Sequence, residues 1–401
     1  MADVKPEKLT TKLLDEWAID PKGPIALHLK QRLMAVEGTD GEEQIIYPPT
    51  YADIGYNIDR LADGTRVALI DSVGSQANRL EPAFKSNSGF DLEGLVPQID
   101  IVLRTEDCGE CENCRKEKKK KDDKCLTPWK EKRSLFDLAH RVSDAVVQSS
   151  PSLLPSIAAA FETLRKTGNA APLCTIAPTS LIFGCWDSRG GSGEKRPRLV
   201  RAIIRAWDVD ELHAAAQFNS IWKLLDDDQK SGLEKALPKG KKLSEKGFKD
   251  APAVKYKDGR RILGGILVRG QVVRDVTVNL VALRGLSGGE HTESMRKYLL
   301  ALAILSGTAD IELFLREGCN LKYADTADQW HSVPRRGTNV PVDLTSSDAR
   351  KVLLKYAAAA RAPFADAWTA LGLASEHEFD LKAAKDLLGK ATEEEAGGKD
   401  E

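Results

Sequence analysis

The hydrophobic and polar positions of this chain alternate between stretches typical of strands and stretches typical of helices. Residues 66–71 (RVALID) form a short apolar run that predicts a buried strand, and helix-compatible residues 72–84 follow it after a Ser/Gly turn. Residues 276–280 alternate apolar and polar side chains, which is typical of a half-buried strand. Residues 292–305 predict a buried helix with Thr292 as its N-cap. This interleaving predicts an α/β or α+β fold.

A Gly-rich basic loop separates two further predicted strands. The apolar runs 178–186 (PTSLIFGCW) and 199–209 (LVRAIIRAWDV) stand on either side of a loop that begins at Arg189. Together they predict a hairpin with a long tip. Residues 226–249 are polar and Lys-rich, and we expect a mobile loop or a short helix there.

Composition restricts the class of protein. The chain has 401 residues, of which 42% are hydrophobic and 30% charged, so it is globular and long enough for one elaborated domain or two. Its 59 Lys and Arg against 60 Asp and Glu exclude a protein that is basic all over, but not a local basic track. No apolar run reaches the ~18 residues of a membrane helix. The start of the chain lacks a secretion signal, and an odd number of cysteines, 7, favours a reducing cytoplasm.

A cluster of cysteines is the sharpest local motif. The spacing C-x2-C-x2-C-x10-C is formed by Cys108, Cys111, Cys114 and Cys125. Two-residue spacing lets one turn present two thiolates to a tetrahedral ion, and a distant cysteine closes the site, so the motif predicts structural zinc. An iron–sulfur cluster is the main alternative, because three cysteines at this spacing also occur in ferredoxin-type runs. Unliganded thiols on a Lys-rich loop are the remaining interpretation, which the crowding disfavours.

Positive residues gather between residues 189 and 205, where a single glutamate opposes them. They are Arg189, Lys195, Arg196, Arg198, Arg201 and Arg205. Arg201 and Arg205 are four residues apart, so they would share one face of a strand. Such a group beside Trp186 and Trp207 is typical of a phosphate track with stacking partners, and the alternative is an ordinary solvated surface.

The segment SVGSQANRLE opens the predicted helix that follows residues 66–71. Its polar side chains include Ser75, Gln76, Asn78 and Arg79. A helix N-terminus with free N–H groups and short polar side chains suits a phosphate, whereas the alternative is a capped helix with an ordinary surface.

Enzyme signatures are missing from the sequence. It has no G-x-S-x-G elbow, no G-x-x-x-x-G-K-[ST] loop and no H-E-x-x-H motif. The 6 histidines are scattered, and His291, in a Gly-rich loop, has no evident partner for acid–base work. We therefore expect a binding protein and not an enzyme.

Five segments, taken in order, resemble a CRISPR-associated family. They are 72–81 (SVGSQANRLE), 140–145 (HRVSDA), 178–188 (PTSLIFGCWDS), 196–209 (RPRLVRAIIRAWDV) and 295–302 (MRKYLLAL). The family is the RAMP-superfamily backbone subunit, of the Cas-seven type, of type I-G (formerly I-U) Cascade surveillance complexes. The resemblance covers roughly residues 66–320, and SQANR-E together with FG-WDS is more specific than either motif alone.

The resemblance implies an α+β fold with an RRM-like, ferredoxin-like βαββαβ core and large insertions. It implies that several copies stack along one CRISPR RNA in the cytoplasm and hold the guide backbone while the bases pair with target DNA. Other Cascade subunits and a helicase-nuclease would be the partners, and the chain itself would be non-catalytic. Carried over by motif, the residues near the guide would be Ser75, Gln76, Asn78, Arg79, His140, Arg141, Trp186, Arg189, Arg198 and Arg201, to which the basic stretch adds Lys195, Arg196 and Arg205.

We expect the chain to divide into five segments. They are a first part of the core (1–104), a Cys/Lys-rich metal-binding insertion (105–133), the rest of the core with the basic hairpin and a thumb-like insertion (134–320), a C-terminal helical region (321–390) and a disordered acidic tail (391–401). The thumb would come from the Cys-rich segment or from residues 226–249.

Two other functions stay open at the level of the residues. A ribonuclease subunit, as in type III backbone proteins, would use a loop aspartate for metal-assisted cutting of target RNA. Asp226, Asp227 and Asp228 are candidates, although an aspartate run is more often a solvated loop or a helix cap. A stand-alone redox or iron–sulfur protein would be built on the cysteine cluster.

Overall fold

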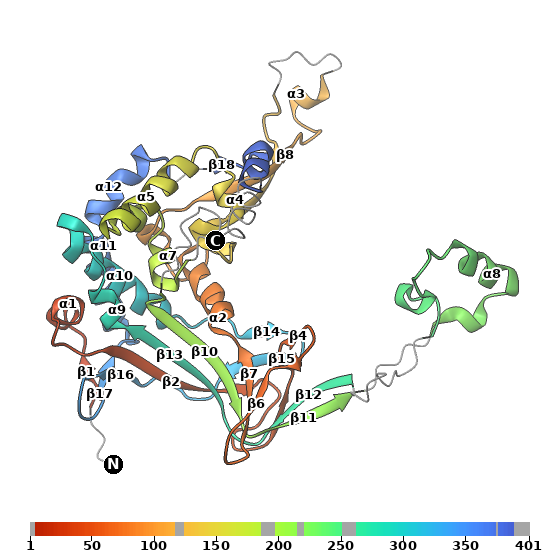
Figure 1. Cartoon of the computed structure of the whole chain (residues 1–401), viewed down its shortest axis with the longest axis horizontal. Coiled ribbons are helices and arrows are strands. Elements are labelled where there is room, and N and C mark those ends of the chain that lie inside the picture. Colours follow the sequence, from red (N-terminus) through yellow and green to blue (C-terminus); the bar gives the residue numbers. More distant parts are fainter. Residues whose placement is uncertain are drawn as a thin grey trace, which may run out of the picture.

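The computed structural model describes residues 5–116, 124–185, 197–214, 220–250, 262–373 and 376–388. It is an α+β protein, as predicted, in which a large sheet carries a layer of helices on one face (Figure 1). Two smaller sheets extend from this body, one toward the cysteine cluster and one toward helix α8. Among the described residues, no helix combines the length and the apolar character needed to cross a membrane.

The main sheet follows a single path with two strands beside it. Along the path lie β1 (Glu7–Lys8), β17 (Val340–Asp343), β16 (Trp330–Val333), β2 (Ala26–Ala35), β13 (Val272–Asn279), β10 (Val200–Trp207), β7 (Arg66–Asp71) and β6 (Ile58–Arg60). Strand β15 (Cys319–Tyr323) joins the end of β2 and pairs with β14 (Phe314–Arg316).

Four central strands have the order that a βαββαβ core requires. In chain order they are β2, β10, β13 and β16, and in the sheet they lie as β16-β2-β13-β10 with every neighbouring pair antiparallel. Helices stand between the first and second of these strands and between the third and fourth. This order is consistent with the predicted RRM-like core, to which β7 and the outer strands are additions.

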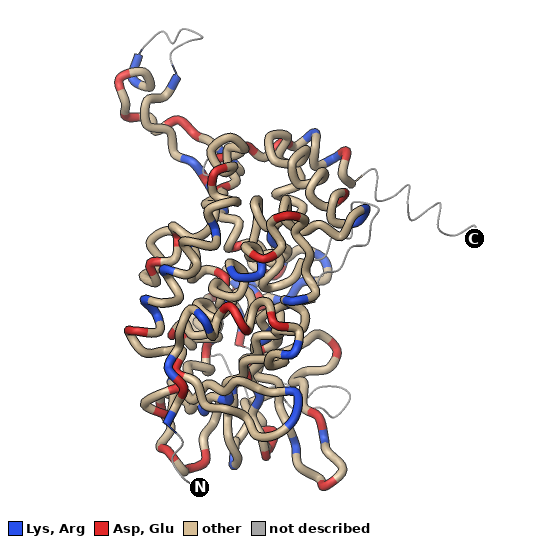
Figure 2. The backbone as a smooth tube through the Cα atoms, turned by 90° about the vertical axis from the view of Figure 1, so that its left-hand side faces the viewer, with Lys and Arg blue, Asp and Glu red and all other residues tan. Residues whose placement is uncertain are grey.

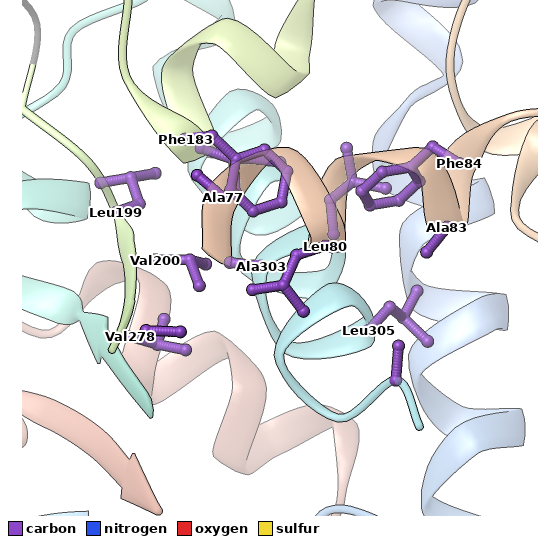
Figure 3. Packing of buried hydrophobic residues seen from close by; sticks show 14 of the residues in the cluster. Ala77, Leu80, Ala83, Phe84, Phe183, Leu199, Val200, Val278, Ala303 and Leu305 are labelled. Carbon is purple, nitrogen blue, oxygen red and sulfur yellow. The ribbon is translucent and has the colours of Figure 1, made fainter. Parts of the chain in front are cut away.

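The helical layer packs around α10 (Thr292–Gly307), which is buried from Tyr298 to its end. The helices around it are α1 (Thr11–Ile19), α2 (Val73–Leu80), α4 (Ala145–Gln148), α5 (Leu154–Thr167), α6 (Ala171–Ile176), α7 (Pro178–Phe183), α9 (Leu280–Arg284), α11 (Ser347–Ala360) and α12 (Ala362–Ala370). Figure 3 shows Ala77 and Leu80 of α2 packed against α10, with Val200 and Val278 of the sheet below them. These residues belong to one continuous hydrophobic core, so α2 is fixed to the body of the protein.

The smaller sheets form two projections. Strands β8 (Asp100–Glu106), β9 (Trp129–Ser134) and β18 (Glu376–Glu378) support the cysteine-rich segment with its short helix α3 (Glu112–Arg115). Strands β11 (Val209–Ala214), β12 (Ile262–Val268) and β3 (Gln44–Ile46) form an arm, with α8 (Asp227–Ala236) beyond it (Figure 1). A two-stranded pair, β4 (Thr50–Tyr51) and β5 (Gly55–Tyr56), and a helix over 381–388 complete the described elements.

The predicted basic hairpin is wrong. Residues 178–183 form helix α7, not a strand, and β10 pairs with β13 and β7 instead. Every residue of α7 is buried, so its sequence lacks the polar face that identifies a helix, and a short apolar run does not separate the two structures. Pro178 at the first helical position was the overlooked signal.

Two smaller predictions also need correction. Helix α10 begins at Thr292, with His291 as N-cap, and the Thr292 hydroxyl bonds to the backbone of Gly288 and Gly289 instead of capping the helix. Residues 321–390 contain α11 and α12 but also β16 and β17 of the main sheet, so this region is not simply helical. Its strands read as loops because they are short and interrupted by Gly, Pro and Asp.

Candidate functional site

The strand-to-helix junction predicted at residues 66–84 is confirmed. Strand β7 ends at Asp71, Ser72 caps α2 by accepting a hydrogen bond from the Ser75 N–H, and α2 carries the SQANR motif. A serine N-cap satisfies one of the backbone donors that the first turn leaves unpaired. The motif therefore starts on a rigid element and not on a loop.

Asp71, which is 1% exposed, gathers most of the polar side chains of the motif. Its carboxylate accepts from Ser75 Oγ at 2.7 Å, from Gln76 Nε2 at 2.7 Å and from Arg79 Nε at 3.1 Å. A guanidinium nitrogen of Arg316 stands 3.6 Å away. A buried carboxylate is tolerated only with such partners, so these side chains hold the junction together.

A second chain of polar contacts crosses the sheet from Gln76. Its Oε1 accepts from Arg274 Nε at 2.9 Å, and Arg274 Nη1 donates to Gln31 Oε1 at 3.0 Å. Gln31 in turn donates to Asp328 at 2.5 Å. Gln76 is completely buried and occupied at both ends of its amide, so we assign it a structural role within the sheet–helix interface. The signal in the sequence was a charged residue inside an apolar strand, as at Asp71 and Arg274.

Replacing Gln76 with leucine should destabilise the protein strongly. The change leaves Arg274 Nε and one Asp71 oxygen buried without their partner, which costs about 2–4 kcal/mol. Urea unfolding of the free chain measures this loss, with Asn78→Ala on the exposed side of the same helix as control. A loss below about 0.5 kcal/mol, the usual range for a surface site, would contradict the structural role.

Arg141 and Glu81 form a buried ion pair beside α2. Arg141 Nε lies 2.6 Å from Glu81 Oε2, and the two side chains are 3% and 0% exposed. The remaining guanidinium nitrogens donate to the Gly184 carbonyl at 3.1 Å, the Ala139 carbonyl at 3.3 Å and Asn78 Oδ1 at 3.2 Å. Arg141 thus ties the end of α2, the turn around residue 140 and the end of α7 to one another.

Glu81 gives the fold a specific dependence on pH. Burial raises its pKa from 4.5 to about 7, against the opposing effect of Arg141. Between these values the folded chain keeps a proton that the unfolded chain has lost, so the free energy of unfolding falls as pH rises from about 4.5 to about 7. Glu81→Gln removes this dependence.

The test compares wild type and Glu81→Gln by urea unfolding at pH 5 and pH 8. The stability of wild type relative to the variant should be about 2.5 kcal/mol greater at pH 5. An advantage that is larger at pH 8 would mean that Glu81 is held ionised by Arg141 and would contradict the assignment.

Several of the predicted RNA-binding side chains meet at one place on the surface. Asn78, His140 and Arg198 are exposed, and both Asn78 and Arg198 lie beside Arg141. Partial desolvation, together with the nearby charge of Arg141, lowers the pKa of the Arg198 guanidinium. We call Asn78, His140, Arg141 and Arg198 the α2 cluster.

Arg201 and Arg205 lie on the opposite face of the sheet. Val200 and Val278 point toward α2 and α10 in Figure 3, so by strand alternation Arg201 and Arg205 face away from the helices. The prediction that they share one face is confirmed, with Arg201 exposed and Arg205 half-buried. The predicted sites at Trp186, Arg189, Lys195 and Arg196 lie outside the described residues. Across the described backbone, basic and acidic residues are interspersed, as the near-neutral total charge requires (Figure 2).

The four predicted cysteine ligands come together at the end of the β8–β9 ribbon. Their sulfur atoms lie 3.3 Å apart for Cys111 and Cys114, 3.4 Å for Cys108 and Cys125, 3.7 Å for Cys111 and Cys125 and 3.9 Å for Cys108 and Cys114. A tetrahedral ion with bonds of ~2.3 Å separates its sulfur ligands by about 3.8 Å. The arrangement fits one metal ion, whereas an iron–sulfur cluster spreads its thiolates over several irons.

Hydrogen bonds to sulfur prepare this site for a metal. Thr127 Oγ1 and the Cys111 N–H donate to Cys108 Sγ at 3.4 and 3.3 Å, and the Leu126 N–H donates to Cys111 Sγ at 3.4 Å. These bonds lower the pKa of Cys108 to about 5 and also lower the pKa of Cys111. Donors around thiolates are a common feature of metal sites, where they orient the ligands.

Taken together, these features describe an α+β protein with a cationic cluster beside α2 and a closed four-cysteine site. Comparison with known proteins gives a more specific assignment. Residues 27–211 match the family model described as "CRISPR-associated protein GSU0053". The resemblance to a CRISPR-associated family is confirmed over these residues, which include the SQANR and FG-WDS motifs and the cysteine cluster.

The structure also aligns with a chain of a solved complex described as "CRISPR RNA-guided surveillance complex, pre-nicking". The alignment covers 84% of this chain and 88% of the other, at 14% identity and a TM-score of 0.27, values too low to establish a common fold. The sequence matches no curated protein.

Proposed function

We propose that this chain is the CRISPR RNA-binding backbone subunit of a cytoplasmic type I-G surveillance complex. Several copies would polymerise along one guide and present it for pairing with target DNA, beside other Cascade subunits and a helicase-nuclease. The observation that carries this proposal is the α2 cluster, where Asn78 and Arg198 meet on the surface of a segment that matches a CRISPR-associated family. Amide and guanidinium donors without a base-reading motif suit a phosphate backbone.

Under this proposal, the arm of β11 and β12 is the thumb-like insertion. The two strands pair from Val209 with Val268 to Ala214 with Ile262, and residues 220–250 form their own small unit at the far end. The cysteine segment is instead a separate metal knuckle on β8 and β9, for which zinc is the proposed ion.

The aspartates favour a non-catalytic subunit over the ribonuclease alternative. Asp226 caps α8, accepting from the Gln229 N–H at 2.8 Å in a reciprocal capping box, and Asp227 pairs with Lys230 at 3.7 Å. These are the contacts of a helix start. We therefore propose that the chain binds RNA and leaves cleavage to a partner.

Titration of the full chain onto labelled repeat–spacer RNA tests the proposal. We expect binding in length-dependent steps, similar affinity for a scrambled RNA of equal length, and weaker binding as salt rises, because contacts to phosphates release counterions. Binding that stays undetectable both for the free chain and with the neighbouring operon proteins added would contradict the proposal.

A further inference from the structure

Arg141 was predicted as an RNA contact, but its side chain points into the protein. It is 3% exposed, and its guanidinium is surrounded by Glu81, the carbonyls of Gly184 and Ala139, and Asn78. The aromatic ring of Phe183 lies against it, 5.5 Å from the guanidinium carbon to the ring centre. A phosphate would have to displace several of these partners to reach it.

The backbone of Arg141 is also fixed in an uncommon conformation. Its φ of 56° lies in the left-handed region, which non-glycine residues adopt at some energetic cost. The following residue, Val142, is buried, so the turn cannot swing the side chain outward without exposing core. The surrounding structure therefore holds the guanidinium in one place.

The contact with Asn78 gives this fixed guanidinium a consequence at the surface. Arg141 Nη2 donates to Asn78 Oδ1 at 3.2 Å, and an arginine has no acceptor to offer in return. Asn78 must therefore direct its oxygen inward, and its Nδ2 group, which has no hydrogen-bond partner among the described residues, takes the outward position on an exposed side chain. An amide held this way offers two N–H donors and no acceptor.

We infer that Arg141 is a positioning residue that acts through Asn78, turning the carboxamide so that its N–H donors face a phosphate of the bound RNA. This inference rests on the proposed function. Arg141 itself makes no RNA contact, and Glu81 holds its charge inside the protein. Without the arginine fork, the carboxamide would rotate freely and present its oxygen, which phosphate repels, for much of the time.

A double-mutant cycle with Arg141→Lys and Asn78→Ala separates this role from a direct contact. Lysine keeps the positive charge but loses the fork that reaches Glu81, Gly184 and Asn78 together. The affinity of the full chain for labelled single-stranded RNA is measured for wild type, both single variants and the double variant. Arg284→Lys is the matched control, because Arg284 also binds two backbone carbonyls through its fork, those of Trp17 and Pro24.

We expect each single variant to weaken RNA binding about fivefold, the value of one hydrogen bond, and the double variant to be no weaker than Asn78→Ala. Arg284→Lys should bind as wild type. Additive losses, or Arg141→Lys at wild-type affinity, would overturn the inference. If Arg141→Lys does not fold, Asn78→Asp decides, since two outward acceptor oxygens should weaken binding more than alanine does, and unchanged binding overturns the inference. Wild-type chain that binds no RNA would instead count against the proposed function.

Discussion

Reversing the charge of Arg198 and Arg201 together is expected to lower RNA affinity by about 100-fold or more while the monomer still folds. Both side chains are exposed, so the change removes no core contact. Each substitution deletes a phosphate partner and places a carboxylate in its position. The dependence of log affinity on log salt should become shallower by about 1.4, because each lost contact contributes about 0.7 on single strands.

The matched control reverses two charges far from the proposed track. Lys351 and Lys355 are exposed on α11, and Lys351→Glu plus Lys355→Glu changes the net charge by the same amount. Fluorescence anisotropy with labelled RNA and circular dichroism of the free chains report binding and folding. If the control loses as much affinity as Arg198→Glu plus Arg201→Glu, the effect is one of total charge, and the placement of the track is wrong.

The single variants decide which face of the sheet carries the RNA. Arg198 belongs to the α2 cluster, whereas Arg201 lies on the face that the helices leave uncovered. A large loss from Arg198→Glu alone places the guide along α2. A large loss from Arg201→Glu alone places it across β10 and its neighbours.

Loss of one cysteine from the knuckle is expected to remove the metal completely. Wild-type chain should carry one zinc ion per molecule, and Cys111→Ser should carry close to none, because a structural site binds through all four thiolates. Metal analysis of purified chains measures this directly. Cys174→Ala is the control, since Cys174 is a buried core residue and not a member of the cluster.

The metal should stabilise the knuckle and leave the core nearly unchanged. Among the described residues, the hydrophobic core includes none between Leu103 and Ser134, so chelation should unfold the segment around Cys108 to Cys125 while the main thermal transition stays in place. Equimolar zinc in Cys111→Ser, or the visible absorption of an iron–sulfur cluster in wild type, would contradict the assignment.

Local features of the sequence predicted their structures well. The strand 66–71 and the helix after it were predictable because an apolar run, a serine cap and a polar helix start lie within a few residues of one another. The cysteine cluster was predictable for the same reason, since its ligands span only a short segment. The Asp226 run was correctly identified as a possible helix cap.

Features that depend on distant partners were not predictable. Arg141 and Arg198 are both cations in polar surroundings in the sequence, yet one is buried against Glu81 and the other is exposed. Gln76 looked like a surface residue until Arg274, far along the chain, was seen to occupy its amide. Pairing across the fold, which a single sequence does not contain, decided each case.

The most direct test of the account is the identity of the nucleic acid that the chain carries in a cell. The chain is co-expressed with a CRISPR array and the neighbouring operon proteins, purified by size exclusion with absorbance at 260 and 280 nm, and the bound RNA is sequenced. The account predicts a large species containing discrete repeat–spacer RNA. A chain that stays free of RNA under these conditions, or that carries RNA without repeat sequence, would contradict it.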